Sequence, residues 1–197
     1  MWYWLFRTVF LIILKIFFRL RVEGLENLPQ KTNFIIVANH LSFMDPIVVG
    51  VAIPQKVHWI THRLLFKIPI LRLFFYLTAC IPSGNSSSKA AELLFQNKNV
   101  GMFPEGAISR SGELLDFKRG SAMLAMKTGR PVVPCAVLGT FKALPFGRMF
   151  PKFVKIKVKV GKPRYFLKEF YIIIDDVDMQ EGLIKIRNTI KELLNAG

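Results

Sequence analysis

Short apolar runs alternate along the chain with stretches of mixed polarity, and this pattern predicts strands that alternate with helices. Continuous runs rich in β-branched residues are typical of strands that are covered on both faces. The predicted strands are Val22–Leu28 (a short strand followed by a turn), Asn33–Ala38, Val57–Thr61, Ala79–Ile81, Val100–Phe103, Val132–Leu138 and Val154–Val160. The last strand alternates lysine with Val and Ile, so we expect it to be half-buried with one lysine face. Such a row of lysines is one device that protects a sheet edge.

Helices are predicted where apolar residues recur at helical spacing or where start and stop signals frame a segment. The predicted helices are Met1–Leu20, Ile47–Ala52, Leu64–Tyr76 (on either side of Pro69), Ser88–Asn97, Ser121–Thr128 and Glu181–Leu194, with a loop at Pro82–Ser87. Asp45 and Pro46 suit the N-cap and the first helical position of the second helix. Because no Gly/Ser/Pro-rich linker divides the chain, we expect a single α/β domain whose central sheet is flanked by helices.

The N-terminal helix predicts a membrane contact. Its longest apolar run, Val9–Leu14, is far shorter than the roughly 18 residues that a spanning helix needs. At about 3.6 residues per turn, its polar side chains fall within an arc of about 120°; they are Arg7, Thr8, Lys15 and Arg19. Such a helix suits the interface of an anionic leaflet. We therefore expect residues 1–21 to form an amphipathic membrane-associated helix and residues 22–197 to form the folded domain.

Two alternatives stay open for this helix. It can pack on the domain with its basic stripe outward, or it can span the membrane at a tilt with its basic side chains reaching the interface. A secretory signal is not expected, because Lys15 interrupts the apolar stretch and no small-residue cleavage site follows.

Composition supports an anionic, lipid-like partner. Lys and Arg number 28 against 13 Asp and Glu, giving a formal net charge of +15, while 52% of the residues are hydrophobic. The charge implies a phospholipid surface, a phosphorylated substrate or nucleic acid, and the apolar excess favours lipid. A solvated basic surface without a partner is the alternative. The two cysteines, Cys80 and Cys135, each lie inside an apolar run, so we interpret them as core thiols in a reducing compartment.

A histidine and a carboxylate follow the predicted strand Asn33–Ala38. Residues 39–45 read NHLSFMD, so four residues separate His40 from Asp45. An aspartate at this spacing can orient one ring nitrogen and stabilise the imidazolium, leaving the other nitrogen to accept a proton. The chain has no G-x-S-x-G elbow, so the activated hydroxyl is expected to belong to the substrate. The alternative is that Asp45 only caps the helix.

A second motif ends the predicted strand Val100–Phe103. Residues 103–106 read FPEG, which places Glu105 on a glycine turn. Side chains that can donate hydrogen bonds to a phosphate follow it; they are Ser109, Arg110, Lys118 and Arg119. A solvated basic loop is the alternative for the last two.

Together these motifs resemble the glycerolipid acyltransferase family, whose members acylate lysophosphatidic acid and related lysolipids. NHLSFMD resembles the family's first block and FPEG its third, FKRG at residues 117–120 resembles the continuation of the third block, and VPCAVLG at residues 133–139 resembles the fourth. The resemblance covers roughly Asn33 to Gly139. It implies a glycerol-3-phosphate acyltransferase-like fold with a mixed sheet. It also implies that an acyl-CoA or acyl carrier protein thioester donates a fatty acyl group to a lysophospholipid hydroxyl, as with 1-acylglycerol-3-phosphate.

The resemblance assigns roles to particular residues. His40 is the expected general base and Asp45 its orienting partner. The acceptor site is expected to include Glu105, Gly106, Ser109, Arg110 and Lys118. No metal or bound cofactor is implied, because the acyl thioester is a co-substrate. The expected location is the cytoplasmic face of a membrane.

Three departures leave the acceptor open. Ala107 and Ile108 stand where many members have Thr-Arg, the stretch Cys80–Asn85 lacks the arginine of the second block, and His62–Leu65 lacks the usual Lys and Glu. We therefore expect acyl transfer to lysophosphatidic acid, to another lysophospholipid or to an amine-linked lysolipid.

The alternative from another class is a non-catalytic binding protein for lipid or nucleic acid. Nucleic acid is not expected, because the Phe residues lie mostly inside apolar runs rather than among basic residues as stacking platforms. His58 and His62 have the spacing of a helical metal pair, but no third ligand accompanies them, so metal binding is not expected.

Overall fold

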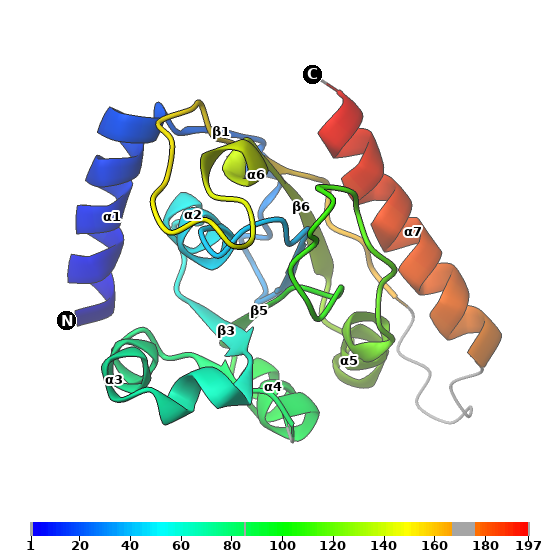
Figure 1. Ribbon diagram of the computed structural model, residues 1–197. Helices are drawn as coiled ribbons and strands as arrows, with labels where there is room; N and C mark the ends of the chain where they lie inside the picture. The colour runs from blue at the N-terminus through cyan, green and yellow to red at the C-terminus, as the bar shows by residue number, and fades with distance from the viewer. Residues whose placement is uncertain (1, 85, 167–175, 197) are drawn as a thin grey trace.

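The computed structural model describes residues 2–84, 86–166 and 176–196, which form an α/β fold around one sheet (Figure 1). The sheet has seven strands in the order β1-β7-β6-β2-β5-β3-β4. Their bounds are β1 (Arg21–Glu23), β2 (Ile35–Ala38), β3 (Val57–Thr61), β4 (Ile81–Pro82), β5 (Asn99–Met102), β6 (Val132–Leu138) and β7 (Lys157–Val160). Among these strands only β6 and β7 pair in antiparallel fashion, and the other neighbours are parallel. The expected mixed sheet flanked by helices is confirmed.

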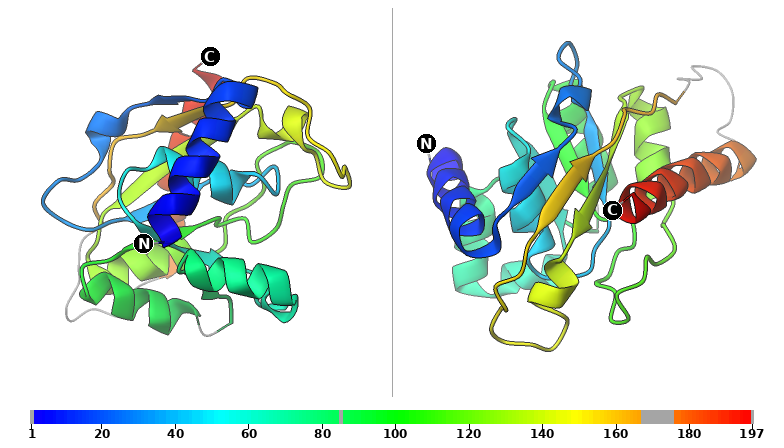
Figure 2. Two further views of the ribbon diagram at one scale, coloured as in Figure 1. Left: turned by 90° about the vertical axis from the view of Figure 1, so that its left-hand side faces the viewer. Right: turned by 90° about the horizontal axis from the view of Figure 1, so that it is seen from above.

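Helices cover both faces of the sheet (Figure 2). The α-helices are α1 (Trp2–Phe18), α2 (Asp45–Ala52), α3 (Pro69–Leu77), α4 (Ser86–Phe95), α5 (Gly120–Thr128), α6 (Thr140–Ala143) and α7 (Asp176–Asn195), and two 3₁₀ helices are η1 (Leu25–Asn27) and η2 (Arg63–Lys67). One core cluster joins the sheet to α1 and α2, and a second joins it to α4, α5 and α7. Within the described ranges, no helix is both long and apolar enough to cross a membrane.

The central strand β2 belongs to both cores. Ile36 and Ala38 pack into the cluster on the α1–α2 side, while Ile35 and Val37 pack into the opposite cluster. All four side chains are fully buried, which explains the uninterrupted apolar run in the sequence. Because β2, β5 and β3 are parallel, their carboxyl ends meet at one edge of the sheet, where α/β proteins place their sites.

Several predicted boundaries are corrected by the structure. The predicted strand Val22–Leu28 is limited to β1, and the chain continues into η1. β4 lies later than predicted, α4 begins and ends two residues earlier, and α7 begins at Asp176 rather than Glu181. The shifts of one or two residues in β4 and α4 are common where helices fray and strand ends lose pairing. Met1 in the predicted first helix and Asn85 in the predicted loop lie outside the described residues.

The interpretation that the lysines of the predicted strand Val154–Val160 protect a sheet edge is wrong. β7 is shorter than predicted and lies inside the sheet, between β1 and β6. Lys159 is buried, and its ammonium donates a hydrogen bond to the carbonyl oxygen of Leu193 at 3.1 Å. A long apolar stem with a satisfied ammonium allows a lysine to occupy such a position.

Helix α1 presents apolar side chains both to the domain and away from it. Leu14 and Phe18 are buried against the domain, and Arg7 Nε donates to the carbonyl oxygen of Ile53 at 3.2 Å. One member of the predicted basic stripe therefore points inward. The outward side chains are Trp2, Trp4, Leu5, Val9, Ile12, Ile13, Ile16 and Phe17, all substantially exposed. The helix thus packs on the domain, but the face left open is largely apolar rather than basic.

Two glycines in the segment after β6 provide a matched test of backbone crowding. Gly139 and Gly147 both have φ near 90°, but a Cβ at Gly139 would collide with the carbonyl oxygen of Lys155, whereas a Cβ at Gly147 would meet open space. We expect Gly147→Ala to lower the free energy of unfolding by about 1 kcal/mol and Gly139→Ala by about 3 kcal/mol or more. Urea unfolding measures both. Equal losses would contradict the close approach of the two backbone segments.

Candidate active site

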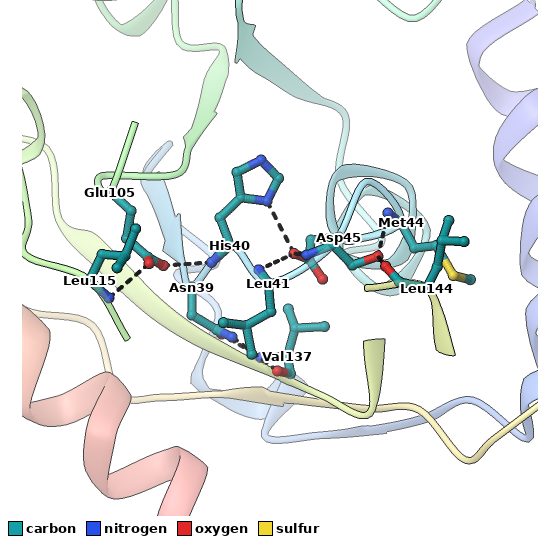
Figure 3. Close-up of polar contacts among 10 residues, drawn as sticks. Asn39, His40, Leu41, Met44, Asp45, Glu105, Leu115, Val137 and Leu144 are labelled. Atoms are coloured by element: carbon teal, nitrogen blue, oxygen red, sulfur yellow. Dashed lines mark hydrogen bonds and ion pairs between the residues drawn. The ribbon is translucent and has the colours of Figure 1, made fainter. Parts of the chain in front are cut away.

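The carboxylate of Asp45 organises the loop between β2 and α2 (Figure 3). Its Oδ2 accepts hydrogen bonds from the backbone N–H groups of Leu41 at 2.6 Å and Ser42 at 2.7 Å, and lies 3.1 Å from Nδ1 of His40. Helix α2 begins at Asp45 itself, and Met44 is its N-cap residue without a side-chain cap. The predicted N-cap role of Asp45 is therefore wrong, because its carboxylate turns back into the loop.

The geometry leaves one ring nitrogen of His40 open. An ionised carboxylate has only acceptors, so Nδ1 of the ring must carry the proton that it shares with Asp45. The other nitrogen, Nε2, then has a free lone pair and points away from Asp45 in Figure 3. The side chain of His40 is 15% exposed. The histidine therefore combines a fixed tautomer with a nitrogen that a reactant can reach.

Two aromatic rings stack in series on the imidazole of His40. The ring of His40 stacks on Phe103 with centroids 4.2 Å apart, and Phe103 stacks on Trp59 at 5.1 Å. Trp59 lies on β3, and Phe103 follows β5. A Cβ at Gly101 would come within 2.7 Å of the Trp59 ring, so glycine at this position of β5 makes room for the stack. No pattern in the sequence had pointed to a role for Trp59.

Glu105 joins the two sequence motifs. Its Oε1 accepts the backbone N–H of His40 at 2.6 Å, and its Oε2 accepts the backbone N–H of Leu115 at 2.9 Å. The residue is almost fully buried. Burial raises the pKa of Glu105, and this effect outweighs the two backbone hydrogen bonds, which lower it. Glu105 therefore braces the backbone of His40 from the neighbouring strand end.

Two buried polar residues of the first motif had no predicted role. Asn39 pairs with the backbone of Val137 on β6, because its Nδ2 donates to the carbonyl oxygen and its Oδ1 accepts the N–H. The hydroxyl of Ser42 donates to the carbonyl oxygen of Leu144 at 2.7 Å. Their membership of NHLSFMD was the only signal in the sequence. Both contacts fix the loop to chain segments about a hundred residues away.

The remaining predicted site residues lie around the same sheet edge. Gly106 has a φ of 68°, and a Cβ there would lie 2.5 Å from Nζ of Lys118, so this ammonium sits over the Glu105 turn. Ser109 is fully buried, and its N–H donates to the carbonyl oxygen of His40 at 2.9 Å. The guanidinium of Arg110 lies over the ring of Phe146 at 4.6 Å. Ser109 thus supports His40, whereas Arg110 is directed toward the segment after α6.

The other histidines and the cysteines do not form a second reactive centre. His58 lies on strand β3 rather than a helix, with Nδ1 3.0 Å from the carbonyl oxygen of Ala79, and His62 precedes η2. Across the described part of the chain, no three His, Cys, Asp or Glu residues gather as metal ligands do. Burial raises the pKa of Cys135 to about 12 and also raises the pKa of Cys80. Both thiols therefore stay protonated and non-nucleophilic near neutral pH.

The raised pKa of Glu105 predicts a pH-dependent stability. A carboxyl group that binds its proton more tightly in the folded state stabilises the fold fully below its ordinary pKa of 4.5 and loses that contribution as pH rises through the folded pKa. We expect the free energy of unfolding of the wild type to fall relative to Glu105→Gln over this rise. Each tenfold difference in proton affinity corresponds to about 1.4 kcal/mol.

Urea unfolding between about pH 4 and pH 8 measures this difference. Glu113→Gln removes a carboxylate that is not buried from the same loop and is the matched control. A constant difference between the wild type and Glu105→Gln across the pH range would contradict the prediction.

Comparisons with known proteins place the chain in a family. The family model described as Acyltransferase matches residues 19–138. A chloroplastic 1-acyl-sn-glycerol-3-phosphate acyltransferase of Brassica napus is 34% identical over 140 residues, covering 66% of this chain and 40% of its own length. The 1-acyl-sn-glycerol-3-phosphate acyltransferase of Bacillus subtilis is 31% identical over 159 residues, covering 77% of both proteins. The chain thus spans less than half of the chloroplastic relative.

A solved structure supports the same relationship across nearly the whole chain. The crystal structure of the 1-acyl-sn-glycerophosphate acyltransferase of Thermotoga maritima matches with a TM-score of 0.73 and 28% sequence identity, covering 95% of this chain and 80% of that one. The family match includes His40, Asp45 and Glu105, together with β2, α2 and β5. On both sequence and structure, the chain belongs to the acyltransferase family.

Proposed function

We propose that this chain transfers a fatty acyl group from an acyl thioester to the hydroxyl of a lysophospholipid such as 1-acylglycerol-3-phosphate, in phospholipid biosynthesis. The observation that carries the proposal is the His40–Asp45 pair, whose geometry leaves Nε2 of the imidazole free to accept a proton. Relatives named for this activity support the choice of acceptor. The donor is acyl-CoA or an acyl carrier protein thioester, acting as a co-substrate.

The reaction follows from the protonation states of the pair. Nε2 of His40 takes the proton of the acceptor hydroxyl as its oxygen attacks the thioester carbonyl carbon, and Asp45 stabilises the resulting imidazolium. The C–S bond then breaks, the new ester forms, and the imidazolium returns the proton to the departing thiolate. Because the two cysteine thiols are held protonated, we propose direct transfer without an acyl-enzyme. These steps require no metal or bound cofactor.

A basic group over the Glu105 turn suits an acidic acceptor. Lys118 lies over the turn at Gly106, and Gly106 directly follows the carboxylate that braces His40. An ammonium in this place can hold a phosphate as a point charge. We propose that Lys118, with Arg110 at the rim, binds the acceptor head group. Glu105 and Ser109 act by positioning the His40 backbone. Glu105 is almost fully buried and Ser109 is fully buried.

An apolar pocket behind His40 suits a fatty acyl chain. It lies between α1, α2 and α3, and its lining includes Phe10, Ile47, Gly50, Trp59, Phe74 and Phe75. Trp59 connects this pocket to His40 through the ring of Phe103. We propose that the acyl chain of the donor occupies it. Only one face of α3 serves the pocket, because Phe74 and Phe75 line it while Ile70 and Tyr76 are exposed.

The outward face of α1 supports association with a membrane surface. Its exposed Trp, Leu, Ile and Phe side chains would be costly in water and favourable at a lipid interface. The helix also carries exposed Lys15, and exposed Arg19 follows it directly; both suit anionic head groups. We propose that the chain binds the cytoplasmic face of a membrane through α1 without crossing it.

The first test measures thiol release from acyl-CoA and from acyl carrier protein with a panel of lysolipid acceptors in detergent. Acceptor-dependent release by the wild type should fall by about 10²-fold or more in His40→Ala, which lacks the base, and in Asp45→Asn, which disturbs its tautomer. His62→Ala removes an exposed histidine near η2 and should leave the rate within about twofold of wild type. Undiminished release by His40→Ala would rule out the mechanism. Wild-type inactivity with every acceptor would contradict the proposed function.

Chain-length preference tests the pocket separately. A Cβ at Gly50 would meet only Nε1 of Trp59, at 3.4 Å, so Gly50→Ala fits, whereas the longer side chain of Gly50→Leu would extend into the pocket. We expect Gly50→Leu to reduce turnover of long-chain donors about tenfold more than turnover of short-chain donors. Gly50→Ala is the control and should change this ratio little. An unchanged ratio in Gly50→Leu would place the acyl chain elsewhere.

A further inference from the structure

The segment between α6 and β7 exposes an unusual density of large apolar side chains. We call residues 144–153 the aromatic loop. Phe146 is 45% exposed, Met149 82%, Phe150 75% and Phe153 67%. Single exposed apolar residues are common on soluble proteins, but a cluster within a short segment marks an interaction surface. The side chains of Met149, Phe150 and Phe153 belong to none of the core clusters and take no part in the chemistry described above.

The aromatic loop continues the apolar outward face of α1. The ring of Phe153 packs against Phe17 with centroids 5.3 Å apart and against Phe18 at 5.5 Å. Phe17 is itself half-exposed on the outward side of α1. In Figure 1 the loop (yellow) runs between α1 and the middle of the molecule, and both views of Figure 2 show it projecting beyond the sheet. One apolar surface therefore extends from α1 onto the loop.

The other end of the aromatic loop is fixed to the catalytic loop. The hydroxyl of Ser42 donates to the carbonyl oxygen of Leu144, and the ring of Phe43 stacks on Phe146 at 5.8 Å. Both Ser42 and Phe43 lie between His40 and Asp45 in the chain. Whatever the aromatic loop contacts therefore lies next to the loop that carries His40.

Charge identifies the partner as an anionic surface. Lys142, Arg148, Lys152 and Lys155 lie in or beside the aromatic loop, and the sequence has no Asp or Glu from residue 117 to residue 168. Aromatic and Met side chains interleaved with Lys and Arg are suited to insertion among anionic head groups. A protein partner of the same shape would need a complementary acidic surface, which a second copy of this basic chain does not offer.

We propose that the aromatic loop inserts into an anionic phospholipid leaflet as a second membrane contact, together with α1. The two contacts would orient the chain so that the loop carrying His40 lies close to the lipid. The benefit of this orientation rests on the proposed function, because the proposed substrates carry acyl chains and reside in the leaflet. The insertion itself is a binding property of the surface.

Vesicle flotation tests the insertion without acyl donor or acceptor, so its result does not depend on catalysis. The double variant Met149→Ser/Phe150→Ser removes the two most exposed apolar side chains of the aromatic loop. The matched control, Phe95→Ser/Ile184→Ser, removes two exposed apolar residues from α4 and α7 on the other face of the sheet. Vesicles of phosphatidylcholine with phosphatidylglycerol should bind the loop variant about tenfold more weakly than the wild type and bind the control equally well.

Charge is tested with Arg148→Gln/Lys152→Gln, which should reduce the preference for phosphatidylglycerol vesicles over pure phosphatidylcholine vesicles about tenfold. Thermal unfolding shows that each variant is folded. Wild-type affinity in the Ser variant, or an equal loss in the control, would overturn the proposal. A change in oligomeric state by light scattering, with vesicle binding intact, would instead identify the aromatic loop as a contact between copies. His40→Ala should bind vesicles like the wild type, which separates this result from the activity test.

Discussion

The carboxylate of Asp45 is fully buried, and one of its oxygens accepts two backbone N–H bonds from the loop that carries His40 in addition to the contact with the imidazole. Burying a charge is costly unless hydrogen bonds compensate it. The loop therefore closes around the carboxylate, and this closure gives the ring its orientation. The compact turn and the tautomer of His40 thus share one cause, and the removal of the carboxylate would disturb both.

Three further contacts hold this loop against the sheet from different directions. Glu105 binds the N–H of His40 from the end of β5, Asn39 pairs with Val137 on β6, and the ring of Phe103 supports the imidazole. Each contact joins segments that are distant in the chain. A catalytic group must be held to within a fraction of an ångström, which such supports achieve more reliably than the loop alone. The FPEG motif at residues 103–106 therefore positions His40 in addition to its proposed role beside the acceptor.

The same scaffold presents apolar side chains in two places that suit lipid. Aromatic rings inside the domain line a pocket behind His40, and those outside form a surface across α1 and the aromatic loop. An enzyme that takes amphiphilic substrates from a leaflet needs both, because the hydrocarbon chain must leave the membrane without crossing water. The basic residues around the aromatic loop add an attraction for the anionic head groups at the same boundary.

The fold class, the succession of most strands and helices, and the pairing of His40 with Asp45 can all be predicted from the amino-acid sequence, because they depend on local periodicity and on close spacing. The sequence also indicated that Glu105 belongs to the site, but not that both its oxygens bind backbone. Three features could not be predicted in this way: Lys159 is buried, Asp45 is not a helix cap, and α1 turns Arg7 inward and apolar side chains outward. Those outcomes depend on partners far away in the chain, such as Leu193 and Ile53. Periodicity in the sequence shows which side chains share one face of a helix or strand. The packing of distant segments determines which residues, or solvent, that face contacts.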